Sequence, residues 1–310
     1  MMQGKIIGNI SNMYKIKTEE KEYNAYARGK LKNIEITPLV GDIVEFSVLN
    51  EEEIKNGHNN EIKNNIYNST KIDAVIEKLL PRKNELKRPK VANIDQIVFI
   101  LSAKHPKPDL LMLDKQLAYA EFVNIKPLII INKMDLANCE EIQKLYTKIG
   151  YKTIISSAKE AIGIGAIKEI LKNKTSVFSG NSGVGKSSII NAIYGYNKTE
   201  EGEISKKNKK GKNTTTDTKL YEIEENTFIA DTPGFSSFDI TEIESTELDK
   251  CFKEFKDKIK NCEFVGCTHI KEKICGIKEA VENGKISQDR YDRYCIIYEE
   301  LKEKEKNRWK

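Results

Sequence analysis

The sequence predicts an α/β domain that is preceded by a small β-barrel and followed by a helical segment. Short segments with strand-like alternation fill the first 76 residues. Between residues 94 and 240, compact apolar strands alternate with helical stretches, a pattern typical of a parallel sheet covered by helices. After Thr241 the strand patterns end, and apolar residues recur at helical spacing.

Length and composition agree with this division. A chain of 310 residues is long enough for about two domains of ordinary size. With 52 Lys and Arg against 47 Asp and Glu, the net charge is +5. No apolar run approaches the roughly 20 residues of a membrane-spanning helix, and the first residues lack the apolar stretch of a secretory signal. We therefore expect a cytoplasmic protein without a membrane partner.

Five strands are expected in the first part. Val44 and Phe46 alternate with polar neighbours, which is the period of a half-buried strand. The expected strands span Lys5 to Ile10, Tyr14 to Thr18, Tyr23 to Arg28, Asp42 to Leu49 and Ile66 to Ile76. A polar loop covers Asn56 to Asn65, and the basic, proline-containing segment 77–93 is expected to be a linker.

The second and third parts differ in their patterns. The expected strands of the α/β part span Gln96 to Leu101, Pro127 to Ile131, Thr153 to Ile155, Ser176 to Phe178, Leu220 to Ile223 and Thr227 to Ala230. Helical spacing covers Leu111 to Phe122 and Cys139 to Ile149. In the third part the apolar stripes comprise Leu248, Phe252, Phe255 and Ile259, and then Tyr291, Tyr294, Cys295, Tyr298 and Leu301. Both stripes are expected to be packing faces.

A phosphate-binding loop lies between a strand and a helical run. Its residues, which fit G-x-x-x-x-G-K-[ST], are Gly180, Asn181, Ser182, Gly183, Val184, Gly185, Lys186 and Ser187, and Ser188 follows in the helix. The glycines let backbone N–H groups surround a β-phosphate. Lys186 can bridge the β and γ oxygens, and Ser187 can ligate Mg²⁺.

Residues able to read guanine precede this loop. The motif Asn132-Lys133-Met134-Asp135 ends an apolar strand, where ligand loops of α/β sheets lie. A carboxylate at Asp135 accepts both N1–H and the exocyclic N2–H of guanine, a donor pair that adenine lacks, and this argues against an ATPase or a kinase. One strand later, Ser157, Ala158 and Lys159 can place backbone amides near the guanine O6.

Two further motifs point to a γ-phosphate sensor. Asp231-Thr232-Pro233-Gly234 follows a strand, so that Asp231 can hold a Mg²⁺-bound water and the Gly234 amide can contact the γ-phosphate. Thr214, Thr215 and Thr216 lie between the phosphate loop and this motif. Thr214 is expected to join Ser187 as a magnesium ligand, although Thr215 and Thr216 are alternatives.

Four residues of the third part have metal-ligand spacing. Cys262, Cys267, His269 and Cys275 supply three sulfurs and a nitrogen within fourteen residues. This set completes the tetrahedral shell of one structural Zn²⁺ and leaves no position for a catalytic water. The remaining cysteines, Cys139, Cys251 and Cys295, are expected to be ordinary thiols.

In its motif order the chain resembles the ribosome-small-subunit-dependent GTPase A family of bacteria, because the guanine motifs come before the phosphate loop. The resemblance implies a circularly permuted α/β P-loop GTPase with an N-terminal OB-type β-barrel and a C-terminal helical zinc-binding domain. The implied limits are 1–76 for an RNA-binding barrel, 77–93 for the linker, 94–240 for the GTPase domain and 241–310 for the zinc domain.

The same resemblance implies a function and partners. The protein is expected to bind the small (30S) ribosomal subunit and its 16S rRNA, to act as a monomer late in subunit maturation, and to hydrolyse GTP to GDP when the particle stimulates it. Three local excesses of basic residues, in 78–90, 205–219 and 302–310, suit a phosphate polymer.

Two departures concern hydrolysis. Phe235 follows Gly234 where many small GTPases have a water-orienting Gln, and Asn213 stands where the family commonly has His. We expect Lys186, Thr214, Gly234 and Asn213 to act in hydrolysis, with Asn213 positioning water by hydrogen bonding unless the particle supplies the missing group. A passive RNA-binding module with a structural nucleotide site remains the alternative.

Overall fold

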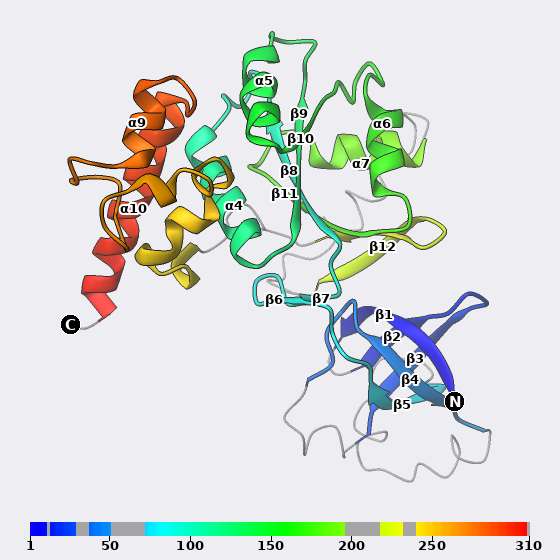
Figure 1. Cartoon of the computed structure of the whole chain (residues 1–310). Coiled ribbons are helices and arrows are strands. Elements are labelled where there is room, and N and C mark those ends of the chain that lie inside the picture. Colours follow the sequence, from blue (N-terminus) through cyan, green and yellow to red (C-terminus); the bar gives the residue numbers. More distant parts are fainter. Residues whose placement is uncertain (11–12, 29–36, 51–71, 196–217, 232–239, 309–310) are drawn as a thin grey trace. The chain divides into compact units, whose positions relative to one another are not determined.

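The computed structural model describes residues 1–10, 13–28, 37–50, 72–195, 218–231 and 240–308. The chain forms two compact units (Figure 1). Unit 1 comprises Met1–Asp95, Leu171–Val177 and Gly211–Gly234, and unit 2 comprises Gln96–Ile170, Phe178–Lys210 and Phe235–Lys310. In the described part of the chain, no helix has both the length and the apolar character needed to cross a bilayer.

Unit 1 begins with a closed barrel of five strands. Its strands are β1 (Met2–Ile10), β2 (Met13–Lys17), β3 (Glu22–Ala27), β4 (Ile43–Val48) and β5 (Ala74–Leu79). β1 pairs with both β2 and β4, β2 pairs with β3, and β5 lies between β3 and β4, so that the sheet closes. Ile6, Ile16 and Phe46 fill the interior and are fully buried.

The expected strands agree with the barrel except at the last one. The predicted strand Ile66 to Ile76 differs from the observed one. From residue 72 on, where the chain is described, the strand β5 begins only at Ala74, and it continues three residues beyond Ile76 to Leu79. Just before β5, the carboxylate of Asp73 accepts a hydrogen bond from the backbone N–H of Asn24 at 2.7 Å. Residues 66–71 and the polar loop Asn56 to Asn65 lie outside the described residues.

The basic segment after the barrel packs against it. It contains a hairpin of β6 (Glu85–Leu86) and β7 (Val91–Ala92), in which Leu86 and Val91 are buried. The Nε and Nη2 atoms of Arg82 donate to the two carboxylate oxygens of buried Asp42, each at 2.8 Å. A bidentate pair of this kind holds the segment in one geometry.

Two more strands and the first three residues of a third, β11 (Thr175–Ser179), belong to unit 1. β11 runs parallel to β13 (Thr227–Asp231), and β12 (Lys219–Glu224) is antiparallel to β13. β1 joins them through one pair, Gly8 with Lys219. Lys5 strengthens the junction, because its Nζ donates to Thr175 Oγ1 at 2.9 Å and lies 4.4 Å from the centroid of the Phe228 ring. Burial lowers the pKa of Lys5.

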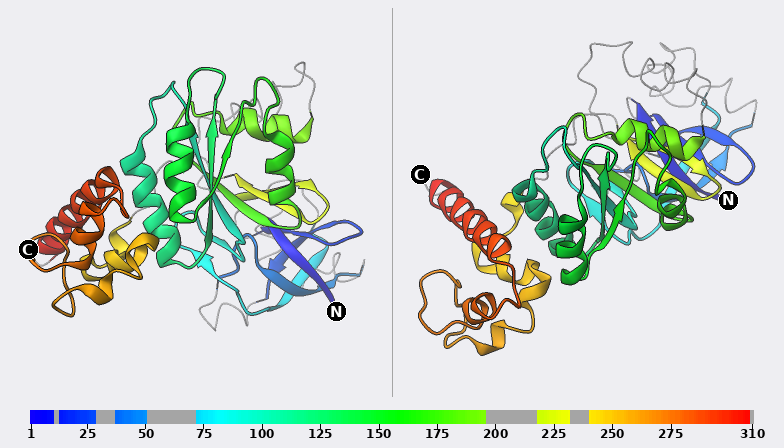
Figure 2. Two further views of the ribbon diagram at one scale, coloured as in Figure 1. Left: turned by 45° about the horizontal axis from the view of Figure 1, so that its top comes forward. Right: turned by 90° about the horizontal axis from the view of Figure 1, so that it is seen from above.

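Unit 2 contains a parallel sheet with helices on both sides. β8 (Gln96–Ser102), β9 (Lys126–Asn132) and β10 (Lys152–Ile155) pair in parallel, and β8 is buried throughout. Figures 1 and 2 show α4 (Leu110–Phe122) and α5 (Glu140–Ile149) on one side of these strands and α6 (Ile164–Leu171) and α7 (Lys186–Tyr194) on the other. The expected parallel α/β pattern is therefore confirmed for these strands.

The C-terminal part of unit 2 is helical in its regular elements. It contains the short 3-10 helices η2 (Ile240–Glu242), η3 (Ser245–Cys251), η4 (Lys253–Phe255) and η5 (Ile259–Asn261), followed by α9 (Gly276–Glu282) and α10 (Gln288–Arg308). Phe252 and Phe255 are buried and lie 5.1 Å and 4.9 Å from Tyr294 of α10 between ring centroids. The first apolar stripe thus packs as predicted, but on successive 3-10 turns, with Ile259 only half-buried.

A buried cluster of charges connects this part to α4. The carboxylate of Asp114 forms ion pairs with Arg290 and Arg293 of α10, and Tyr146 of α5 donates its hydroxyl to Asp114 at 2.6 Å. Asp114 and Arg290 are both fully buried. Because a buried charge that lost its partner would be strongly destabilising, this cluster fixes α10 on the α/β core.

Candidate nucleotide and metal sites

The phosphate loop occupies the turn between β11 and α7. Gly183 and Gly185 have φ angles of 78° and 98°, which only glycine adopts easily. A Cβ on Gly185 would lie 2.3 Å from the Nδ2 atom of Asn132. The ammonium of Lys186 donates to the carbonyl of Gly180 at 2.5 Å and to that of Asn181 at 3.0 Å, so it lies within the loop.

Asn132 ties this loop to two other segments. Its Nδ2 donates to the carbonyl of Val184 at 3.0 Å, and its Oδ1 accepts from the backbone N–H of Ala158 at 3.1 Å. The side chain is 1% exposed. The residue predicted for guanine reading therefore also holds the phosphate loop and the 156–158 loop together, and this second contact was missed from the sequence.

Lys133 makes a similar connection. Its backbone has a φ of 65°, and its Nζ donates to the carbonyls of His105 at 2.5 Å and Gly183 at 2.6 Å. One ammonium thus joins the loop after β8 to the phosphate loop. The role of His105 was not predicted, because only its backbone takes part and no side-chain motif marks it.

Asp135 is exposed and already oriented. Its Oδ1 accepts from the hydroxyl of Ser157 at 2.7 Å, and Ser157 is fully buried. The structure thus brings together the carboxylate, the 157–159 segment and the phosphate loop in unit 2. Exposed members of the predicted set include Lys159, Ser182, Gly183, Ser187 and Ser188.

The predicted γ-phosphate sensor is described only in part. Asp231 is the last residue of β13, where it pairs across the hairpin with Lys219. Asn213, Thr214, Thr215 and Gly234 lie outside the described residues. Their functions stay predictions.

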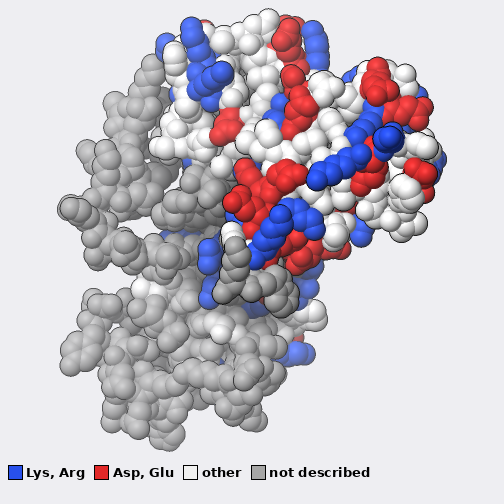
Figure 3. Space-filling view, turned by 90° about the vertical axis from the view of Figure 1, so that its left-hand side faces the viewer, with Lys and Arg blue, Asp and Glu red and all other residues white. Residues whose placement is uncertain are grey.

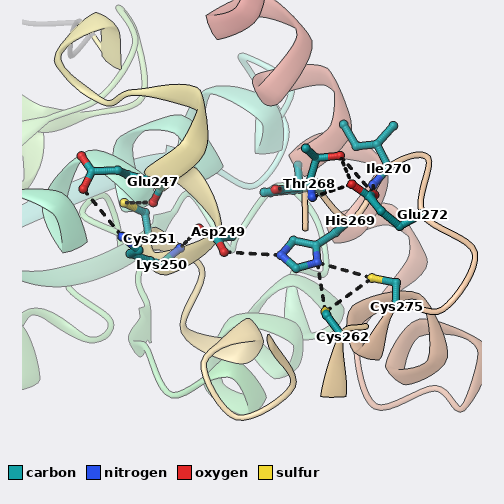
Figure 4. A network of polar contacts seen from close by, with 11 residues as sticks. Glu247, Asp249, Lys250, Cys251, Cys262, Thr268, His269, Ile270, Glu272 and Cys275 are labelled. Atoms are coloured by element: carbon teal, nitrogen blue, oxygen red, sulfur yellow. Dashed lines mark hydrogen bonds and ion pairs between the residues drawn. The ribbon is translucent and has the colours of Figure 1, made fainter. Parts of the chain in front are cut away.

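The four predicted zinc ligands converge on one point in the tail, and Figure 4 shows three of them, Cys262, His269 and Cys275. Their sulfur and nitrogen ligand atoms all lie within 4.8 Å of one another. The Nδ1 of His269 is 3.5 Å from Cys262 Sγ and 3.4 Å from Cys275 Sγ, and Cys267 and Cys275 are buried. Three sulfurs and one imidazole nitrogen in a compact cluster, of which only Cys262 is half-buried and the rest are buried, fit tetrahedral Zn²⁺.

A carboxylate supports the histidine from behind. The Nε2 atom of His269 lies 3.4 Å from Oδ2 of Asp249, opposite to the nitrogen that faces the thiols (Figure 4). Tyr291 of α10 donates its hydroxyl to the carbonyl of His269 at 2.6 Å. Such partners orient a ligating histidine and set its tautomer. Asp249 was missed because it lies 20 residues before His269 with no motif to mark it.

Two ionisable side chains at the cluster have strongly shifted pKa values. Burial raises the pKa of the Cys267 thiol to about 12. The pKa of Glu272 is shifted in the opposite direction. Burial alone would raise it, but hydrogen bonds from the N–H groups of Thr268 and Ile270 lower it to about 2. The ionised Glu272 therefore secures the loop that carries His269.

Comparison with known proteins agrees with the geometry. The RsgA GTPase model matches residues 79–241, and the RsgA N-terminal domain model matches residues 3–54. The chain belongs to the RsgA GTPase family. The first of these matches spans the guanine motif, the phosphate loop and the Asp231 motif, so this member of the RsgA family is a GTPase that hydrolyses GTP.

Relatives in the RsgA family cover the whole chain. Proteins described as small ribosomal subunit biogenesis GTPase RsgA are 37% identical over 305 residues in Alkaliphilus metalliredigens and 38% identical over 312 residues in Caldanaerobacter subterraneus. These alignments include 97% and 100% of this chain and 98% and 99% of the relatives.

Solved structures confirm the predicted fold class. YjeQ from Thermotoga maritima is 35% identical, with a TM-score of 0.76 over 96% of this chain and 98% of that one. YloQ, described as a circularly permuted GTPase, is 32% identical, with a TM-score of 0.76 over 98% of this chain and 96% of that one. The five-stranded barrel and the helical tail with its Cys and His cluster complete the predicted architecture.

Proposed function

We propose that this GTPase assists late maturation of the small (30S) ribosomal subunit. The observation that carries the proposal is full-length similarity to relatives described as small ribosomal subunit biogenesis GTPases, at 37% identity over 97% of this chain. The protein would act in the cytoplasm as a monomer, bind the particle through its 16S rRNA, and hydrolyse GTP when bound there.

Guanine nucleotide would be held by three segments of unit 2. Asp135, oriented by Ser157 at 2.7 Å, would accept N1–H and N2–H of the base, while Asn132, Lys133 and the 157–159 segment complete the base pocket. Backbone N–H groups of 180–188 would surround the phosphates. Since the carbonyls of Gly180 and Asn181 hold the Lys186 ammonium in the loop, it needs only a short movement to reach a β or γ oxygen.

Hydrolysis would depend on residues at the γ-phosphate. Lys186 would neutralise charge that develops on the transferred group, the Gly234 amide would contact it, and Asn213 would orient the attacking water. Ser187 and Thr214 would hold Mg²⁺, with Thr215 beside them and Asp231 on a bound water. Mg²⁺ supplies positive charge to the phosphate oxygens. Because neither Asn213 nor Phe235 can take a proton from water, intrinsic turnover should be slow.

The remaining parts would bind rRNA and position the GTPase. We assign residues 1–76 to an RNA-binding barrel, 77–93 to a basic connection, 94–240 to the GTPase domain and 241–310 to the zinc domain. Cys262, Cys267, His269 and Cys275 would hold one structural Zn²⁺, for which the convergence of all four ligand atoms within 4.8 Å is the support.

Single-turnover hydrolysis of bound GTP, titrated with purified small subunits at two salt concentrations, tests the proposal. The particle should raise the rate by orders of magnitude, comparable with the roughly 10³ to 10⁵ gains obtained when a partner completes a GTPase site. The Lys186→Ala variant should hydrolyse no GTP with or without the particle. Asn213→His should raise the stimulated rate, or leave it unchanged if the particle supplies the essential group.

Three results would contradict the proposal or a part of it. A rate that is fast without the particle and indifferent to it would exclude ribosome-coupled hydrolysis. Absence of hydrolysis under every condition would favour a passive RNA-binding module with a structural nucleotide site. Equal binding of ATP and GTP would exclude the guanine-reading role of Asp135.

A further inference from the structure

Three large apolar side chains are exposed on the loops between the zinc ligands. Phe264 is 58% exposed and Val265 is fully exposed, both between Cys262 and Cys267, and Ile274, immediately before Cys275, is 61% exposed. The N–H of Glu263 donates to the carbonyl of Ile274 at 3.3 Å, which brings the two loops together. We call Phe264, Val265 and Ile274 the apolar tip. Contiguous exposed apolar groups of this kind indicate an interaction site.

The metal cluster underneath makes the tip rigid. Cys262 and Cys267 flank Phe264 and Val265 in sequence, Cys275 follows Ile274, and the ligand atoms of all these cysteines lie within 4.8 Å of one another. Gly266 allows the tight return with a φ of 79°. A side chain presented on a loop that is already ordered loses little conformational entropy on binding. The tip is therefore suited to direct contact with a partner.

Charges around the tip favour an anionic partner. Residues 258–275 contain four lysines, Lys258, Lys260, Lys271 and Lys273, and no ion pair with a described residue involves any of their ammonium groups. Of the two glutamates there, Glu272 turns its carboxylate to backbone N–H groups, which leaves Glu263 as the opposing exposed acid.

Charge alone does not define the contact. On the face that Figure 3 shows, basic and acidic side chains alternate over the described surface, without a continuous basic field. An exposed aromatic ring on the same loops as these lysines has a more specific use, because unpaired RNA bases stack on aromatic side chains while lysines hold the adjacent phosphates.

We infer that Phe264 is a stacking platform for an unpaired RNA base, with Val265 and Ile274 beside the base and the nearby lysines on its flanking phosphates. This inference rests on the proposed function and adds the mode of contact. It differs from an apolar contact with a protein, in which a leucine at position 264 would serve about as well as phenylalanine. The ring is what distinguishes the two.

Binding of Phe264 variants to purified small subunits tests the inference. Phe264→Ala and Phe264→Leu should both weaken binding by about tenfold to a hundredfold, in line with alanine substitution of stacking residues. Phe264→Trp should bind like the wild type. Ile296→Ala provides the control, since Ile296 is another exposed apolar residue, on α10, and its loss should change nothing. Metal analysis and intrinsic GTP turnover should be the same for every variant.

Salt dependence separates stacking from charge. The slope of log K against log salt should stay unchanged in Phe264→Ala, whereas Lys271→Ala and Lys273→Ala should each reduce it by about 0.7, the value per phosphate of a single strand. If Phe264→Leu binds normally while Phe264→Ala does not, the partner is a protein and the inference is wrong. Normal binding by all three Phe264 variants would also overturn it. If the wild-type protein binds no particle, the proposed function itself fails.

Discussion

The guanine site and the zinc cluster hold their residues in place by different means. In the guanine site, protein groups satisfy one another: the amide of Asn132 bonds to Val184 and Ala158, and Asp135 bonds to Ser157. In the zinc cluster, the ligand atoms of Cys262, Cys267, His269 and Cys275 face one another. A site held by its own hydrogen bonds can release and rebind its ligand, whereas a site made of facing thiols depends on its ion.

This contrast explains how one chain can combine an exchangeable ligand with a permanent one. In each cycle GTP must enter the guanine site and GDP must leave it, so the site has to keep its shape when empty. The zinc site has no such requirement, and the ion can hold together the loops of residues 262–275, which contain no helix or strand. The contrast predicts that loss of a metal ligand loosens the tail, whereas loss of a single group in the guanine site changes nucleotide binding and leaves the fold intact.

The largest effect is expected from loss of zinc. Cys262→Ser should remove the metal and loosen the region after Thr241, while nucleotide still binds to unit 2, because the ligand set is the main constraint on these loops. Metal analysis and limited proteolysis measure the two effects. Cys139→Ser is the matched control, since Cys139 is buried outside the cluster, and it should retain zinc. If native protein contained no zinc after careful purification, the proposed metal site would be wrong.

Alkylation of thiols gives a second measure of the same event. After chelation, Cys262, Cys267 and Cys275 should become reactive at pH 8, because the loops that carry them lose their cross-link and the burial that raises the pKa of Cys267 is lost with it. Cys251 should remain unmodified, because burial raises its pKa to about 12 and leaves almost no thiolate. Rapid modification of Cys251 together with the ligands would mean that the whole tail unfolds when the ion leaves.

A smaller effect on zinc binding is expected from Asp249, which contacts the ligand His269 without binding the ion itself. Asp249→Ala removes the carboxylate 3.4 Å from His269 Nε2, and zinc affinity should fall by about tenfold to a hundredfold, as is typical of such partners. Competition with a chelator measures it. Asp289→Ala removes an exposed acid of α10 and should leave zinc affinity unchanged. Equal affinity in both variants would show that Asp249 does not orient the histidine.

In the guanine site, Asp135→Asn should change the preference from guanine to xanthine nucleotides and leave the fold intact. The amide cannot accept both N1–H and N2–H, so GDP affinity should fall at least about tenfold, or about 1.4 kcal/mol, while xanthosine diphosphate gains. Titration with both nucleotides provides its own control. A parallel loss of affinity for both would point to a folding defect.

The smallest effect should come from the residue that orients Asp135. Ser157→Ala removes one hydrogen bond of 2.7 Å, worth about 0.5–1.5 kcal/mol, so GDP affinity should fall about twofold to tenfold with guanine specificity unchanged. Calorimetric titration is precise enough to detect this. A loss as large as that of Asp135→Asn would mean that Ser157 contacts the nucleotide directly.

The sequence by itself determined the chemistry of each site. Motif spacing predicted the phosphate loop, the guanine-reading carboxylate and the four metal ligands, because each depends on residue types at short separations along the chain. Hydrophobic periodicity predicted the order of barrel, α/β domain and helical tail. It was less accurate for the start of β5 and for the 3-10 segments around Leu248, since local periodicity does not distinguish one helix from successive short turns.

Only the tertiary structure decided how these sites are supported. Asp114 meets Arg293 across 179 residues of sequence, and Asn132 meets Val184 across 52. Asp249 is likewise selected by the packing of η3 against the zinc loops. These hydrogen bonds and ion pairs depend on which surfaces become buried together, because removing polar groups from water makes their pairing obligatory. Such pairings arise from the fold as a whole and leave no local pattern in the chain.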